Sequence, residues 1–462
     1  MSQIVADFVS CQNQINSFFV NQRISMLLKQ SNIDKKYGVS AVVVMRYIFS
    51  LIFTGKNMFR SLQITESNAE FYKDTAYRFL NSVNANWRKF LHLLSAAIIN
   101  KELVPLTSKK TAKVFIADDS LYNRNRSKKV ELLAKVHDHN ENRYYRGFRM
   151  LTLGWSDGIS QIPVSFAMLS SANEKNRFAP MQEGIDKRTN GYRRRLESVT
   201  KSPQVLVDLV RSALKSGIHA DYILFDSWFS FPSTIMAMLA TKVHVVCMLK
   251  DLKTIRYGYQ GKSLRLGELF KVVRKKAGRA KILAQVVVEL GKDDKGMPVQ
   301  VKIAFVRDRS SKNWLALLST DVTLKEEEII SLYKRRWDIE VFFKMTKSFL
   351  NLAKEFQSRS YDALVAHTTI VFCRYIMLAL ARRMNKDPRT LGTLFHAGCD
   401  ELRQATFAEA LQQMLAILQD LAREFLGLTV AQIDCLLQKF INEITPLFRR
   451  YLLLPEVNLA NC

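Results

Sequence analysis

The chain has 462 residues, 48% hydrophobic and 24% charged, a composition that excludes a disordered protein and allows two to four folded domains. An excess of 69 lysines and arginines over 42 acidic residues gives a formal net charge of +27, which favours a polyanionic partner, nucleic acid before an acidic membrane. Six scattered cysteines without a CxxC pair argue against a zinc ribbon and a disulfide framework, and they suit a reducing compartment.

Two apolar runs approach the length of a membrane span, but each contains charge. "VSAVVVMRYIFSLIFTG" includes Arg46, and "ALVAHTTIVFCRYIMLALA" includes His367 and Arg374. Because charged side chains are costly in lipid, we expect both runs to form buried core helices. The N-terminus also lacks a signal-peptide pattern. The expectation is a soluble, cytoplasmic, nucleoid-associated protein with no membrane partner.

In the first half of the chain the predicted secondary structure changes from helices to strands near residue 112. Residues 1 to about 110 have the three-and-four spacing of helices. "KVFIADDS" then predicts a buried strand that ends in two acids. "YRGFRMLTLGWSDGISQIPVSFAMLS" predicts two strands joined by a turn at 156–158. The basic "KRTNGYRRR" (187–195) predicts a loop, and "SPQVLVDLVRSALKSG" predicts an amphipathic helix that ends at Gly217.

The second half begins with another acid-ended strand, "ADYILFDSWFS". From about 240 to 320 the period is two, and "KVHVVCML", "AKILAQVVVEL", "PVQVKIAFVR" and "NWLALLST" predict strands of an antiparallel insert. "LGKDDKGMP" predicts a hairpin loop between two of them. Helical spacing returns at "TLKEEEIISLYKRRWDIEVFFKMTKSFL" and continues to the end.

One acid in the last of these segments, Glu340, lies among basic and aromatic residues. A single helix over Leu332–Leu350 gathers one polar face and one apolar face. The polar face holds Tyr333, Arg336, Glu340 and Lys347, and the apolar face holds Ile339, Phe342, Met345 and Phe349. A solvated face with weak ion pairs is the plain alternative. Acids at two strand ends and one helix, however, are what two Mg²⁺ ions need for phosphodiester chemistry.

The spacing Y-x2-R-x3-E-x6-K resembles the YREK signature of DDE transposases of bacterial insertion sequences (insertion-sequence family four). "FIADDS", "ILFDSWFS" and "NWLALLST" resemble the family's two acid-bearing strands and the strand before its signature helix. The likeness covers residues 110 to 385. It implies an α/β fold, with a ribonuclease-H-like core, a β-rich insertion, a helical N-terminal domain and a helical C-terminal region. The expected units are 1–110 for DNA binding, 111–240 and 323–385 for the core, 241–322 for the insertion, and 386–462 for dimerisation.

By this resemblance Asp119, Asp226 and Glu340 bind two Mg²⁺ ions, for which Mn²⁺ can substitute. Asp118 is the rival for the first acid. We expect Asp119, because it lies nearer the loop and directly precedes the hydroxyl residue Ser120, as in the family pattern.

Further residues are expected to contact DNA. The resemblance implies that Tyr333, Arg336 and Lys347, with the adjacent Lys344, hold phosphates, and that Trp314 stacks on a flipped base; packing inside the insertion is the alternative for Trp314. The basic stretch after Asp119 either grips transposon-end DNA or is a solvated loop. Its candidate DNA contacts are Arg124, Arg126 and Lys128. A metal site at His137 and His139 is not expected, because no third ligand accompanies them.

The resemblance thus predicts a cut-and-paste transposase that hydrolyses the transposon end, closes a hairpin and joins the end to target DNA. Its partners are double-stranded DNA, at the terminal inverted repeats and the target, and a second copy of the chain in a synaptic homodimer. The alternatives are a ribonuclease-H-like DNA nuclease without strand transfer, and a catalytically silent DNA-binding protein derived from a transposase.

Overall fold

Short amphipathic helices build the N-terminal part of the chain. The computed structural model describes residues 14–35, 37–55, 71–138, 141–276, 280–293, 295–308, 313–355 and 358–443. Ahead of the first strand lie α2 (Gln14–Asn21), α3 (Ile24–Gln30), α4 (Ala41–Ser50), α6 (Lys73–Leu80), α7 (Trp87–Ala97), the π-helical η2 (Ile98–Leu103) and the 3-10 turn η3 (Val104–Leu106). Their apolar faces share one hydrophobic core with the rest of the protein.

A single mixed sheet runs through the molecule. Its order is β2-β3-β1-β5-β6-β11-β10-β9-β7-β8, with β4 paired to β3. The strands are β1 (Val114–Asn123), β2 (Ala134–Asp138), β3 (Arg143–Ser156), β4 (Gln161–Leu169), β5 (Tyr222–Phe225), β6 (His244–Leu249), β7 (Tyr257–Tyr259), β8 (Lys262–Leu264), β9 (Ile282–Lys292), β10 (Pro298–Arg307) and β11 (Trp314–Ser319). The pairs β1–β5 and β5–β6 are parallel, and the other pairs are antiparallel.

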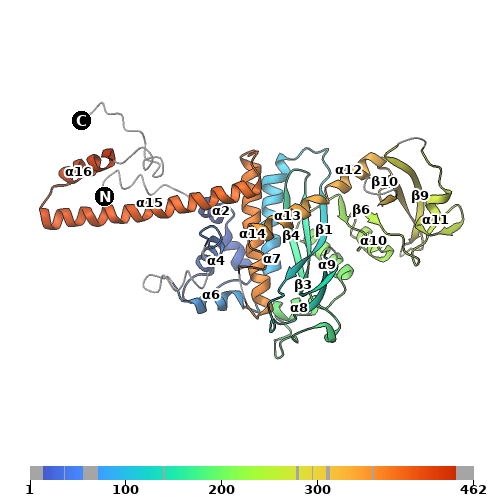
Figure 1. Ribbon diagram of the computed structural model, residues 1–462, viewed down its shortest axis with the longest axis horizontal. Helices are drawn as coiled ribbons and strands as arrows, with labels where there is room; N and C mark the ends of the chain where they lie inside the picture. The colour runs from blue at the N-terminus through green and yellow to red at the C-terminus, as the bar shows by residue number, and fades with distance from the viewer. Residues whose placement is uncertain are drawn as a thin grey trace.

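Helices cover both the sheet and its ends. After β4 come α8 (Asn190–Ser198), α9 (Ser202–Lys215), α10 (Pro232–Leu239), α11 (Leu266–Val272), α12 (Glu326–Lys334), α13 (Trp337–Ser348), α14 (Tyr361–Met384), α15 (Leu391–Leu426) and α16 (Val430–Glu443). Both α7 and α14 pack on β4, side by side (Figure 1), and α13 packs on β1. The predicted α/β fold with a ribonuclease-H-like sheet and helices at both ends is confirmed.

Most predicted strands are found, but the strands around the insertion pair differently from the expectation. The turn between β3 and β4 forms at 156–158, where Gly158 takes a φ of +87° that favours glycine. The hairpin between β9 and β10 also forms. The expectation that "KVHVVCML" belongs to an antiparallel insert is wrong, because β6 pairs in parallel with β5 and belongs to the central sheet. Through β11 the insertion strands extend that same sheet.

Two further local predictions are wrong. "KRTNGYRRR" is not simply a loop, because α8 begins within it at Asn190, where the Thr189 side chain caps the helix by accepting the Tyr192 N–H. The single helix expected over Leu332–Leu350 is two helices, α12 and α13, separated by a turn at 335–336.

Both apolar runs are core helices, as predicted. Among the described residues, α14 alone has the length and apolar composition of a membrane span, and 89% of its apolar window is buried inside the protein. Two of its residues, His367 and Arg374, are buried with the carboxylate of Glu355. The helix α4 buries its apolar face and leaves Arg46 exposed.

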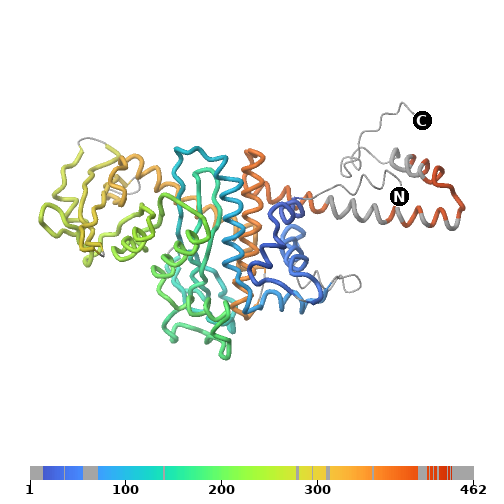
Figure 2. The backbone as a smooth tube through the Cα atoms, turned by 180° about the vertical axis from the view of Figure 1, so that it is seen from behind, coloured from blue at the N-terminus to red at the C-terminus, as the bar shows by residue number. Residues whose placement is uncertain are grey.

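The molecule is elongated, with different structures at its two ends. The insertion, with α11, β9 and β10, lies at one end (Figure 1). At the other end α15 projects away from the body, and α16 folds back along it (Figures 1 and 2). Leu415, Ala422 and Ile433 form a small core between these two helices, separate from the main one.

Candidate active site

An open pocket of about 670 Å³ lies where the central strands β1 and β5 end beside α13. Its lining contains five acids, namely Asp118, Asp119, Asp138, Asp226 and Glu340. Five cations also line it, namely Arg149, Lys250, Arg336, Lys344 and Lys347. The pocket therefore combines carboxylates with an equal number of positively charged side chains.

The parallel pairing of β1 with β5 brings two of the acids level with each other. Ile116 lies opposite Leu224 at the end of this register. Two residues further along the chain are Asp118, still within β1, and Asp226, directly after β5. The Asp226 carboxylate also accepts the backbone N–H of Trp228 at 2.9 Å, which fixes the turn after β5. Asp118 and Asp226 are thus the acids that the sheet itself aligns.

Asp118 and Asp119 have different partners. Arg336, at the start of α13, donates to Asp118 at 2.8 Å. Arg149, on β3, donates to both oxygens of Asp119 at 3.0 and 3.1 Å. Neighbouring side chains on a strand point to opposite faces, so Asp118 is the acid that faces α13. Burial, together with the negative charges of Asp226 and Asp119, raises the pKa of Asp118 to about 7 against the opposing effect of Arg336.

The third acid, Glu340, lies one helical turn after Arg336 on α13. Arg336 also donates to this carboxylate, so its guanidinium bridges Asp118 and Glu340. The turn at 335–336 keeps right-handed helical φ and ψ angles, and the polar stripe survives it. Tyr333, by contrast, lies on α12 and is half-buried, and burial raises the pKa of its hydroxyl.

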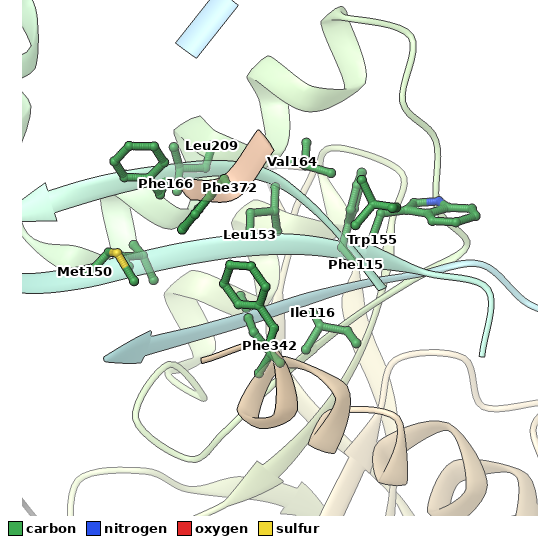
Figure 3. Close-up of a cluster of buried hydrophobic side chains, with 14 of the residues drawn as sticks. Phe115, Ile116, Met150, Leu153, Trp155, Val164, Phe166, Leu209, Phe342 and Phe372 are labelled. Atoms are coloured by element: carbon green, nitrogen blue, oxygen red, sulfur yellow. The ribbon is translucent and has the colours of Figure 1, made fainter. Parts of the chain in front are cut away.

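The opposite face of α13 packs on the sheet as predicted. Ile339, Phe342 and Met345 are buried, and Phe349 is half-buried. Phe342 lies beside Ile116 of β1 (Figure 3), and its ring contacts Phe372 of α14 with centroids 4.9 Å apart. Burial of side chains of this size contributes roughly 1.5–3 kcal/mol each, and it fixes the direction in which Glu340 points.

Lys347 connects α13 to the acid-bearing strand. Its ammonium group donates to the Ser120 hydroxyl at 2.6 Å, and burial lowers the pKa of Lys347. Lys344 is exposed at the rim of the pocket. Cations so placed can hold phosphate oxygens beside the carboxylates.

The donor set suits a hard divalent cation, because all of its ligands are carboxylate oxygens. Among the residues that the structure describes, no three acids, histidines or cysteines already lie close enough together to hold a metal ion. The guanidinium of Arg336 instead lies between the carboxylates of Asp118 and Glu340 and forms an ion pair with each. His137 lines the pocket, and His139 lies outside the described residues.

Several residues expected at DNA lie elsewhere. Arg124 is only 6% exposed and donates to the backbone oxygen of Ala353, which contradicts the expectation that it contacts DNA. Arg126 and Lys128 are exposed on the loop after β1.

Trp314 lies in the insertion, away from the pocket lining. It packs against Phe270 and Phe305, with ring centroids 4.9 and 5.1 Å away. These contacts match the packing alternative for Trp314.

Several pocket residues were missed from the sequence, among them Asp138, Arg149, Trp228 and Lys250. Trp228 and Lys250 follow the ends of β5 and β6, and Arg149 lies on β3. Trp228 stands two residues after an acid in "ILFDSWFS", and that adjacency was the available signal. The position of Arg149 depends on which strands pair, and this pairing cannot be read from the local sequence.

The central sheet and the acids and cations of its pocket lie within two stretches that match family models of DDE enzymes. Residues 45–259 match the family model of the DDE superfamily endonucleases, and residues 186–360 match that of the archaeal ISC1217 transposases. The chain has no match among curated proteins. The two family matches support an insertion-sequence DDE transposase, a nucleic-acid-cleaving enzyme of a superfamily that generally uses divalent metals.

Proposed function

We propose that the chain is a cut-and-paste DDE transposase of the YREK group, which hydrolyses the phosphodiester at a transposon end and joins the freed 3′-hydroxyl to target DNA. The observation that carries this proposal is the level alignment of Asp118 and Asp226 on adjacent strands, with Glu340 across Arg336 in the same pocket. Carboxylates in one pocket are the ligands that metal-dependent cleavage of a phosphodiester needs.

We assign the metal ligands as Asp118, Asp226 and Glu340, in place of the expected set with Asp119. The partners of the two neighbouring acids support this choice, because Asp118 faces α13 while Asp119 is held by Arg149. Two Mg²⁺ ions, or Mn²⁺, would supply an activated nucleophilic oxygen and stabilise the leaving oxygen.

The protein's own side chains position the DNA. Arg336, Lys344 and Lys347 line the pocket and are suited to bind the phosphates on either side of the cut. Tyr333 packs under Arg336, whose guanidinium lies 6.0 Å from the ring centroid, and so orients it. The hairpin intermediate is part of the proposal by resemblance to the YREK group.

The remaining parts of the chain would bind the partners. The helices before β1 are proposed to read the terminal inverted repeats, since the pocket needs none of them for its chemistry. A homodimer is required to hold two transposon ends together. The projecting α15 and α16 are the proposed dimer contact, because α15 exposes large apolar side chains such as Met414, Ile417 and Leu421.

A cleavage assay tests the function. Labelled duplex carrying the DNA that flanks the coding sequence is incubated with Mg²⁺ and wild type, Glu340→Ala or the control Glu327→Ala, an exposed acid on α12. We expect wild type and the control to cleave the duplex and transfer the strand, and Glu340→Ala to do neither. Inactive wild type would indicate a silent DNA-binding protein, and cleavage without joining would indicate a simple nuclease.

A further inference from the structure

Trp228 is a large aromatic side chain left half exposed in the wall of the pocket. Its exposed fraction is 49%, whereas Trp87 and Trp155 are 1% and 0% exposed in the core. It stands two residues after Asp226 and lines the same pocket as the acids. An indole contributes little to folding in such a place, which points to a role toward a ligand.

The backbone on both sides of Trp228 is fixed. Its N–H donates to the Asp226 carboxylate at 2.9 Å, and the next residue, Phe229, is 1% exposed and packs edge-on against Phe225. The Ser230 hydroxyl donates to the backbone oxygen of Ser227 at 2.9 Å and closes the same turn. The indole is therefore carried by a rigid turn and does not sit on a free loop.

A positioned cation lies over the same indole. The Arg149 guanidinium is 5.7 Å from the ring centroid of Trp228. Arg149 is held there by both oxygens of Asp119 and by the backbone oxygen of His137 at 3.2 Å. An aromatic ring and a planar guanidinium are the two side-chain surfaces on which nucleobases stack.

We propose that Trp228 stacks on an unpaired nucleobase next to the phosphate at the cleavage point, and that Arg149 is a positioning residue for this platform. The proposal rests on the proposed function, since it assumes that DNA enters the pocket. It gives Asp119 a different task from Asp118: Asp119 holds Arg149 in place. Trp314 does not compete for this role, because its ring is packed against Phe270 and Phe305.

Base stacking can be measured without cleavage. The full-length protein in EDTA is titrated with a single-stranded oligonucleotide, and with copies of it that carry one abasic site moved stepwise along the strand. Wild type is expected to bind the intact oligonucleotide roughly 5- to 100-fold more tightly than the copy abasic at the stacked position, the effect of one stacked base.

Three variants give the proposal its test. Trp228→Ala is expected to lose the difference between the intact and abasic strands, and Trp228→Phe to keep most of it, because a ring remains. Trp337→Ala, which removes a 64%-exposed indole on α13 outside the pocket lining, is the matched control and is expected to keep it fully.

The outcomes separate the two proposals. The stacking role would be overturned if wild type bound the intact and abasic strands equally. It would also be overturned if Trp228→Ala kept the difference in affinity, or if Trp228→Phe lost it. Stacking by a protein that never cleaves DNA would leave the platform in place and remove the transposase function instead.

Discussion

Arg336 donates a hydrogen bond of 2.8 Å to Asp118, although the two residues lie 218 positions apart in the chain. The same guanidinium reaches Glu340, so one protein cation stands between two acids that we propose as metal ligands. A divalent cation at those acids would take over this neutralising role and leave Arg336 to a substrate phosphate.

Replacing Arg336 by Gln should therefore make the protein depend on metal for stability. Without metal the acids lose their counter-charge, and the melting temperature should fall. Added Mn²⁺ should then raise the melting temperature of Arg336→Gln by more than that of wild type, as thermal unfolding in EDTA and in Mn²⁺ would show. Arg335→Gln is the control, because Arg335 donates to the backbone oxygen of Ala112 instead. Equal responses to Mn²⁺ in all three proteins would contradict the prediction.

Substitutions of the two neighbouring aspartates, Asp118 and Asp119, should have different effects on cleavage and on metal binding. Asp118→Asn removes a proposed ligand, so cleavage should fall roughly 10³-fold, corresponding to several kcal/mol of lost metal-assisted stabilisation. Calorimetric titration with Mn²⁺ should show weaker binding to the same variant. Asp119→Asn should keep Mn²⁺ binding and affect mainly DNA affinity, through Arg149. The reverse pattern would restore Asp119 as the ligand.

Local patterns were enough to predict most elements and the acids of the site. Asp226 and Glu340 could be proposed because each acid directly follows or lies within an element with clear periodicity. The choice between Asp118 and Asp119 could not be made in this way. It depends on which face of β1 meets α13, and that is set by pairing with β3 and β5 far along the chain.

Other misses have the same physical origin. The five basic residues in "KRTNGYRRR" are typical of a solvated loop, but Arg195 is fully buried because Glu131 and Asp362 neutralise it from distant elements. Arg124 is buried for a similar reason, with an acceptor contributed by Ala353. A buried charge depends on partners that only the folded chain brings together.

The ion cluster around Arg195 should be a strong determinant of stability. Arg195 donates to Glu131 at 2.6 and 2.8 Å and to Asp362 at 3.0 and 2.7 Å, joining α8, the loop after β1 and α14. Arg195→Met leaves two acids without their common partner, so the free energy of unfolding in urea should fall by roughly 3–5 kcal/mol. Arg188→Met is the matched control, because its pair with Asp186 is exposed, and it should change stability by less than about 1 kcal/mol. Similar losses in both variants would refute the structural role of the cluster.

Acid should destabilise the protein partly through Glu355. Burial alone would raise the pKa of this carboxyl, but Arg374 and His367 hold it at about 2, below its ordinary value of 4.5. Arg374 also donates to the backbone oxygens of Ile48 and Phe49, which ties the N-terminal helices to α14. A depressed pKa contributes stability that is complete above pH 4.5 and is lost as the pH falls toward 2.

Glu355→Gln should therefore be less stable than wild type at pH 7 by about 3 kcal/mol, from a shift of this size at 1.36 kcal/mol per pKa unit. The difference should shrink as the pH falls from 4.5 to 2, because wild type then loses the charge that the variant already lacks. Urea unfolding at a series of pH values measures this. Glu174→Gln alters a surface ion pair with Arg177, and its free energy of unfolding should follow that of wild type at every pH. A Glu355→Gln curve that also runs parallel to wild type would show that Glu355 titrates normally in the folded protein.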